Sequence, residues 1–121
     1  MNDSFFRLLP EGDPASGLQP IAEVAQEDFT TEDHSEIEHI FFKTKNKSTW
    51  TGVWECAPCL EEIESYPVNE MMTVISGSVT LTDENGKSET YTSGDTFFIT
   101  KGAKIKWHIT EKLRKFYMIT S

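Results

Sequence analysis

The chain has 121 residues, the size of one domain with room for a sizeable core. Its formal net charge is −9, and residues 1–70 carry 15 of the acidic side chains against 4 basic ones. Nucleic acid is disfavoured as a partner, because binding to phosphates requires a basic surface. No stretch approaches the roughly 18 consecutive apolar residues of a membrane span. We therefore expect a globular protein with neither nucleic-acid nor membrane partners.

No signal peptide is predicted, because the N-terminus lacks a basic region followed by an apolar run and a cleavage site. A cytoplasmic location follows by default, and Cys56 and Cys59 are then expected to be reduced thiols. Their CxxC spacing also occurs in redox pairs and zinc sites. Neither a helix signal nor a second CxxC accompanies it. We interpret Cys56 as structural and Cys59 as incidental, and expect Cys59→Gly to be tolerated.

Residues 1–36 are predicted to form an N-terminal arm. Proline and glycine recur through the first twenty positions, which favours an irregular segment over a helix. The apolar cluster between Phe5 and Leu9 is expected to pack on the rest of the chain or on a partner. One or two helical turns are expected within residues 21–27.

Residues 37–121 read as one β domain. Strands are predicted at residues 37–43, 50–56, 71–75, 79–82, 90–92, 96–100, 104–109 and 115–119. Asn85-Gly86 predicts a hairpin with a type I′ turn, since both residues tolerate positive φ. Many short strands with glycine-marked turns and almost no helix predict an all-β fold, an antiparallel β-barrel.

Two of these strands are apolar on both faces. Met71 and Ile75 alternate with Met72 and Val74, and residues 96–100 follow the same pattern. A sheet with one face in water would alternate apolar and polar residues. The second face is therefore expected to be covered by the arm, by a partner or by both, and we predict a homodimer.

The candidate site lies between Glu64 and Gly77. In an extended chain Glu64 and Tyr66 share a face, and Pro67 favours a bend that returns Glu70 beside them. Two carboxylates and a phenol are thus predicted to converge. A carboxylate beside another in a semi-apolar pocket has a raised pKa and is suited to acid–base chemistry. The alternative is that Glu64 belongs to a solvated acidic run and only Glu70 points inward.

The spacing of Glu70 and Gly77 resembles the first motif of the cupin superfamily, in which six residues separate a Glu from a Gly. The stretches at residues 51–58, 69–86, 93–102 and 113–119 resemble small single-domain cupins of the ureidoglycine aminohydrolase-like (DUF861) family. The resemblance implies an RmlC-like jelly roll. It also implies an enzyme that releases ammonia from a ureide or another small polar nitrogenous metabolite.

The resemblance implies a divalent metal as well, held by the residues at Glu64, Tyr66, Glu70 and Ile105. Of these, Glu64 matches the family's residue and Ile105 is unable to bind a metal. None of the three histidines falls on a ligand position. Two carboxylates without imidazole would hold a hard ion such as Mn weakly. We therefore favour a pocket without metal over a weak site at Glu64 and Glu70.

The pocket walls are predicted to include Ile105 and Trp107, which share a face, together with Met72 and Trp54. Two functions stay open from the sequence. One is the ureide-type enzyme, with Glu70, Glu64 and Tyr66 as catalytic residues. The other is a module without catalysis that binds a small ligand or a partner protein.

Overall fold

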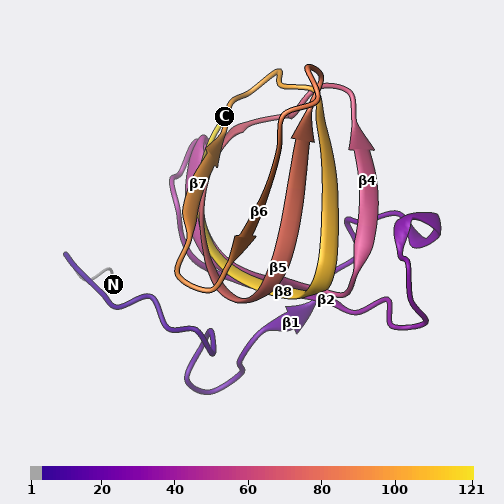
Figure 1. Cartoon of the computed structure of the whole chain (residues 1–121). Helices are drawn as coiled ribbons and strands as arrows, with labels where there is room; N and C mark the ends of the chain where they lie inside the picture. The colour runs from indigo at the N-terminus through magenta and orange to yellow at the C-terminus, as the bar shows by residue number, and fades with distance from the viewer. Residues whose placement is uncertain (1–3) are drawn as a thin grey trace.

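The computed structural model describes residues 4–121 (Figure 1), and in this part of the chain it contains eight β strands and one 3-10 helix. The elements are β1 (Gln19–Pro20), η1 (Gln26–Asp28), β2 (Glu36–Lys43), β3 (Thr49–Cys56), β4 (Cys59–Ile63), β5 (Asn69–Asp83), β6 (Ser88–Thr92), β7 (Thr96–Ile99) and β8 (Ile105–Thr120). Every strand pairing is antiparallel. The predicted all-β antiparallel fold is confirmed.

The two longest strands, β5 and β8, run side by side and belong to both halves of the fold. The first part of β5 pairs with β7 and its second part with β6. The first part of β8 pairs with β4, and its second part with β3, which continues to β2 and β1. Both long strands therefore wrap around one interior, as Figure 1 shows, in the jelly-roll arrangement expected from the sequence.

Gly77 lies inside β5 and does not begin a new strand. The pairing of β5 with β8 is irregular between Val74 and Val79, and Gly77 has a φ of +84°. A Cβ at this position would lie 1.9 Å from the carbonyl oxygen of Lys112. The separate strands predicted at 71–75 and 79–82 are thus one bent strand, because glycine forms a bulge here where we expected a turn. The strands predicted at 104–109 and 115–119 likewise belong to one strand, β8, which begins at Ile105.

The hairpin between β5 and β6 forms where expected, but its predicted turn type is wrong. Gly86 has a φ of +86°, whereas Asn85 is not among the residues with positive φ. The Gly86 amide donates to the Asp83 carbonyl at 3.1 Å. The Asp83 carboxylate also accepts from the amides of Asn85 and Lys87. These bonds satisfy the turn without the two positive φ angles of type I′.

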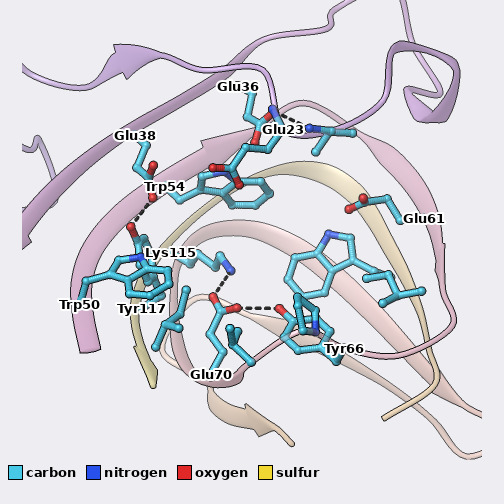
Figure 2. A pocket seen from close by; sticks show the side chains of 16 residues that line it. Glu23, Glu36, Glu38, Trp50, Trp54, Glu61, Tyr66, Glu70, Lys115 and Tyr117 are labelled. Atoms are coloured by element: carbon cyan, nitrogen blue, oxygen red, sulfur yellow. Dashed lines mark hydrogen bonds and ion pairs between the residues drawn. The ribbon is translucent and has the colours of Figure 1, made fainter. Parts of the chain in front are cut away.

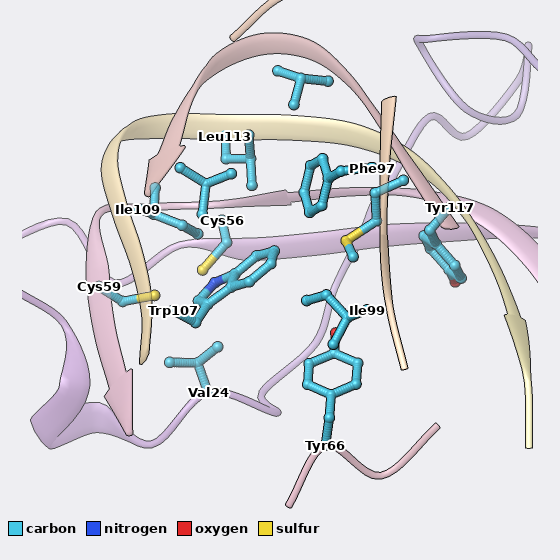
Figure 3. Packing of buried hydrophobic residues seen from close by; sticks show 13 residues of the cluster. Val24, Cys56, Cys59, Tyr66, Phe97, Ile99, Trp107, Ile109, Leu113 and Tyr117 are labelled. Atoms are coloured by element: carbon cyan, nitrogen blue, oxygen red, sulfur yellow. The ribbon is translucent and has the colours of Figure 1, made fainter. Parts of the chain in front are cut away.

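The cysteines belong to the core (Figure 3), which corrects the prediction that Cys59 is incidental. Cys56 and Cys59 are both free thiols with no exposed surface. The hydrogen bond with Cys59, followed by burial, raises the pKa of the Cys56 thiol. Cys59 begins β4, which the sequence prediction missed, and it faces Ile109 across the sheet. Replacement of Cys59 by glycine would therefore leave a void in a closely packed interior.

Much of the N-terminal segment contacts the sheet. Gln19–Pro20 pairs with β2, and the Ile21 amide donates to the Glu36 carbonyl at 2.9 Å. Val24 is buried in the core, and Arg114 donates to the Pro10 carbonyl at 2.7 Å. Helical structure near the predicted turns is limited to η1. The division into an arm at 1–36 and a domain at 37–121 stays a prediction, and residues 1–3 of that arm lie outside the described residues.

Apolar side chains form a row across the outer face of the sheet. Phe98 is opposite Met71, Met71 is opposite Met118, and Thr51 connects Met118 to Phe42. The four apolar members of this row are 41% to 55% exposed.

Between residues 4 and 121 there is no helix long and apolar enough to cross a membrane.

Candidate functional site

A pocket of about 490 Å³ lies between the inner face of the sheet and the segment before β2 (Figure 2). Its wall combines carboxylates, one ammonium and aromatic rings. Those residues are Glu23, Glu36, Glu38, Glu61, Glu70, Lys115, Trp50, Trp54, Tyr66, Trp107 and Tyr117.

Glu70, Lys115 and Tyr66 form a hydrogen-bonded group in the pocket (Figure 2). Glu70 points inward because it alternates with exposed Met71 along β5, and Lys115 alternates similarly along β8. The Lys115 ammonium donates to Glu70 Oε2 at 2.8 Å, and the Tyr66 hydroxyl donates to Oε1 at 2.6 Å. Glu70 and Lys115 are each only 5% exposed. Both oxygens of the motif carboxylate are therefore already bonded within the chain.

Three aromatic rings surround the Lys115 ammonium. Its Nζ lies 4.8 Å from the ring centroid of Trp54, 5.0 Å from that of Trp107 and 5.7 Å from that of Tyr117. The Met72 sulfur accepts from Nζ at 3.0 Å. Ring faces attract cations, and they do so more strongly when water is excluded. The rings and Glu70 together offset the cost of burying this charge.

Glu36 connects the pocket wall to the segment before β2. Its Oε1 accepts from the amides of Glu23 and Val24 at 3.0 Å and 2.9 Å, and its Oε2 accepts from Trp54 Nε1 at 2.9 Å. Glu36 is 4% exposed, so these donors replace the water that a buried carboxylate would otherwise need. The carboxylate thereby fixes both the Trp54 ring and the course of residues 23–24 along the pocket.

The pocket shifts the ionisation of several of its side chains. Burial, followed by neighbouring carboxylates, raises the pKa of Glu23 and of Glu61. Burial also raises the pKa of Tyr66, and the Glu70 charge adds to this effect. The pKa of Tyr117 is raised by burial and by its hydrogen bond to Glu38. Both phenols consequently stay protonated at neutral pH and act as hydrogen-bond donors.

Glu64 lies outside the pocket, so its predicted convergence with Tyr66 and Glu70 is wrong. Strand β4 ends at Ile63, before the position where alternation would have aligned Glu64 with Tyr66. The Glu64 side chain is 84% exposed, and its carboxylate lies 3.7 Å from the Lys104 ammonium. Only the Tyr66–Glu70 half of the predicted constellation is brought together.

Of the four residues predicted to form the pocket walls, three lie at or directly behind the pocket and one does not. Trp54 and Trp107 line the pocket, and Met72 is fully buried behind it, in contact with the Lys115 ammonium. Ile105 lies elsewhere, because it pairs with Ile63 and Asp83 near the other end of β8. A functional role for these residues stays a prediction.

Sequence reasoning missed Lys115, Glu23, Glu36, Glu38 and Glu61. A signal for two of them was present. Lys115 shares a strand face with apolar Leu113 and Tyr117, and Glu61 shares one with Cys59 and Ile63, so each occupies a core-facing position. The remaining three carboxylates come from a segment whose place beside the pocket depends on tertiary contacts.

The model of the EutQ-like cupin domain matches residues 44–117. The chain belongs to this cupin family. A DUF861-family protein of unknown function from Pseudomonas syringae pv. tomato has a similar structure, with a TM-score of 0.78 and 30% sequence identity. That similarity covers 90% of this chain but 46% of the Pseudomonas chain, so this protein spans less than half of its length.

Two further cupins are similar. A DUF861-family protein from Thermotoga maritima has 31% identity and a TM-score of 0.50, over 54% of this chain and 73% of that one. The EutQ protein of Clostridium difficile has 21% identity and a TM-score of 0.60, over 82% of this chain and 80% of that one, and supports the fold alone. No curated protein matches the chain.

The metal that the cupin family suggests does not fit the residues of this pocket. An ammonium lies 2.8 Å from the motif carboxylate, where a second cation would be repelled. Within residues 4–121, no group of three or more His, Cys, Asp or Glu side chains is arranged to hold a metal ion. His34 bonds to Gln26 outside the pocket. The weak Mn site predicted at Glu64 and Glu70 has lost its geometric basis, since these two carboxylates do not converge.

Proposed function

We propose that this protein is a small-ligand-binding cupin in which the Lys115 ammonium replaces a metal ion. The supporting observation is the Lys115–Glu70–Tyr66 group in the pocket, which supplies a fixed positive charge and satisfies both oxygens of the motif carboxylate. The pocket volume of about 490 Å³ falls in the range of small-molecule sites, roughly 300–1,000 Å³. This is the non-catalytic function left open by the sequence.

Binding in this pocket is tested with a matched pair of tryptophan substitutions. Val68 lines the pocket and Ser65 is exposed outside it. Val68→Trp should fill the pocket, whereas Ser65→Trp should not. A ligand-observed NMR screen with cationic, anionic and neutral fragments should give ligands that bind the parent and Ser65→Trp but not Val68→Trp. Absence of any fragment with this pattern would reject the proposed function.

Metal content gives an independent test. Protein purified without an affinity tag should contain little Zn, Fe, Ni or Mn by elemental analysis, and added Mn should not protect it against thermal unfolding. Stoichiometric metal that survives dialysis would contradict the replacement by Lys115. Lys115→Met should not by itself create a metal site, because the described residues hold no group of three or more His, Cys, Asp or Glu side chains arranged for a metal ion.

A ureide-type enzyme is the second candidate. The similarity to DUF861-family proteins at 30% and 31% identity favours it, and the Tyr66–Glu70–Lys115 chain provides groups for proton transfer. Ammonia release from ureides, measured on the parent and on Glu70→Gln, distinguishes catalysis from binding. Release that depends on Glu70 would establish the enzyme, and ligand binding without turnover would reject it.

A homodimer is proposed through the outer apolar row of Phe98, Met71, Met118 and Phe42. A second copy would cover side chains that are 41% to 55% exposed and that one sheet presents together. Light scattering at micromolar concentration should give the mass of a dimer, and Met71→Glu should shift it toward a monomer. A parent protein that runs as a monomer would exclude this interface. The cytoplasmic location stays a prediction.

A further inference from the structure

The pocket carries more negative charge than the chain itself neutralises. Five glutamates and one lysine line it, and Lys115 is paired with Glu70. In the described part of the chain, no Lys, Arg or His forms an ion pair with Glu23, Glu36, Glu38 or Glu61. Four carboxylates around one pocket without a cation repel one another and lose hydration.

Two of these four carboxylates also lack hydrogen-bond donors. Glu36 accepts three hydrogen bonds and Glu38 accepts one from Tyr117. Across residues 4–121, no side chain or amide donates to the carboxylate of Glu23 or Glu61. Burial, followed by neighbouring carboxylates, raises the pKa of each, and ionisation is disfavoured above all at Glu61, which is half-buried, since Glu23 stays exposed to solvent. A bound cation would relieve this cost.

A third observation is the indole nitrogen of Trp107. Trp107 lines the pocket, is 3% exposed, and its Nε1 is buried with no hydrogen-bond partner in residues 4–121. A buried donor left unpaired is unfavourable, so a ligand acceptor at this atom would be stabilising. Glu61 lies directly opposite Trp107 in the β4–β8 pairing, so an unpaired carboxylate and an unpaired donor occupy neighbouring positions on one inner face.

The aromatic walls favour an organic cation over a metal ion. The Trp54 and Trp107 rings contact the Lys115 ammonium at 4.8 Å and 5.0 Å, and aromatic rings of this kind also attract alkylammonium ions. Trp50 adds a further ring to the wall. An anionic ligand would find no free positive charge, because Lys115 is paired with Glu70.

We propose that the pocket binds a small alkylammonium compound that also carries a neutral oxygen acceptor, such as an amino alcohol. Glu61 and Glu23 receive the ammonium, the tryptophan faces pack against its carbon atoms, and Trp107 Nε1 donates to the oxygen. This inference rests on the proposed function and specifies the ligand class of the same pocket.

Choline provides a direct probe, because its neutral isostere with carbon in place of nitrogen has the same shape. Titrations followed by tryptophan fluorescence and calorimetry should show choline binding at least tenfold more tightly than the isostere. Glu61→Gln should weaken choline binding about tenfold and leave the isostere unchanged. Glu62→Gln is the matched control on the same strand, since that carboxylate is 69% exposed and faces Lys106, and it should change neither.

Tetramethylammonium tests the oxygen acceptor, because it has the charge of choline without the hydroxyl. Trp107→Phe should weaken choline severalfold more than it weakens tetramethylammonium, because only choline loses a hydrogen bond from Nε1. Equal binding of choline and its isostere, or preferential binding of a carboxylate such as acetate, would overturn the ligand class while the binding function stands. A loss of choline binding in Glu62→Gln equal to that in Glu61→Gln would place the cation outside the pocket and overturn the inference as well.

Discussion

The pairing of Lys115 with Glu70 gives the sharpest prediction of stability. Both residues are 5% exposed, and Nζ lies 2.8 Å from Oε2. Removal of one partner of a buried ion pair leaves an uncompensated charge and costs about 3–5 kcal/mol. A domain of this size has a total stability of roughly 5–15 kcal/mol. Lys115→Met should therefore destabilise the protein severely, and Glu70→Gln should do so to a similar extent.

The double substitution Lys115→Met with Glu70→Gln should recover most of that loss. It removes both charges, and the glutamine amide still offers an acceptor to the Tyr66 hydroxyl. Urea denaturation followed by tryptophan fluorescence gives each free energy of unfolding at pH 7. Lys106→Met serves as the surface control, because Lys106 is 48% exposed on its side chain, and it should cost less than about 1 kcal/mol.

The double-mutant cycle determines whether the reasoning holds. A strongly coupled pair gives a double variant close to the parent and an interaction energy of several kcal/mol. If the two single losses simply add in the double variant, the ion pair is not what stabilises the pocket. A Lys115→Met variant as stable as the Lys106→Met control would refute the account just as directly.

Three further predictions follow from local geometry. Gly77→Ala should lower the free energy of unfolding by more than about 1 kcal/mol, because its Cβ would meet a backbone oxygen at 1.9 Å. Gly86→Ala has open space around it and should cost only about 1 kcal/mol. Equal urea midpoints for the two variants would contradict this difference. The pKa of Glu61 is raised by burial and by the charges of Asp28, Glu36 and Glu23, against the opposing effect of Lys115. Ionisation of Glu61 therefore disfavours the folded state as pH rises above about 4. Glu61→Gln should be more stable than the parent at pH 7, and this gain in stability should fade near pH 4. A gain that persists there would count against this cause. Cys56 and Cys59 are fully buried, so an aromatic disulfide reagent should react with them only in denaturant, and rapid reaction of the native protein would show that this part of the core opens.

The sequence by itself determined the fold class, because strand alternation and turn chemistry are local. It also identified Glu70 and Tyr66, Trp54 and Trp107 as members of one pocket, since spacing along a strand fixes which face a residue occupies. The prediction for Glu64 was wrong because it applied the same local rule beyond the end of a strand. Alternation predicts a shared face only within a strand, and β4 ends at Ile63, one residue before it.

Only the tertiary structure decided what Glu70 pairs with. Lys115 is 45 residues further along the chain, and its ammonium meets Glu70 because β5 and β8 pair over nearly their full length. Glu23 lies beside the pocket through Glu36, whose bonds to the amides of Glu23 and Val24 fix that segment there. Contacts between residues so far apart depend on strand pairing and segment packing, and no local pattern specifies them.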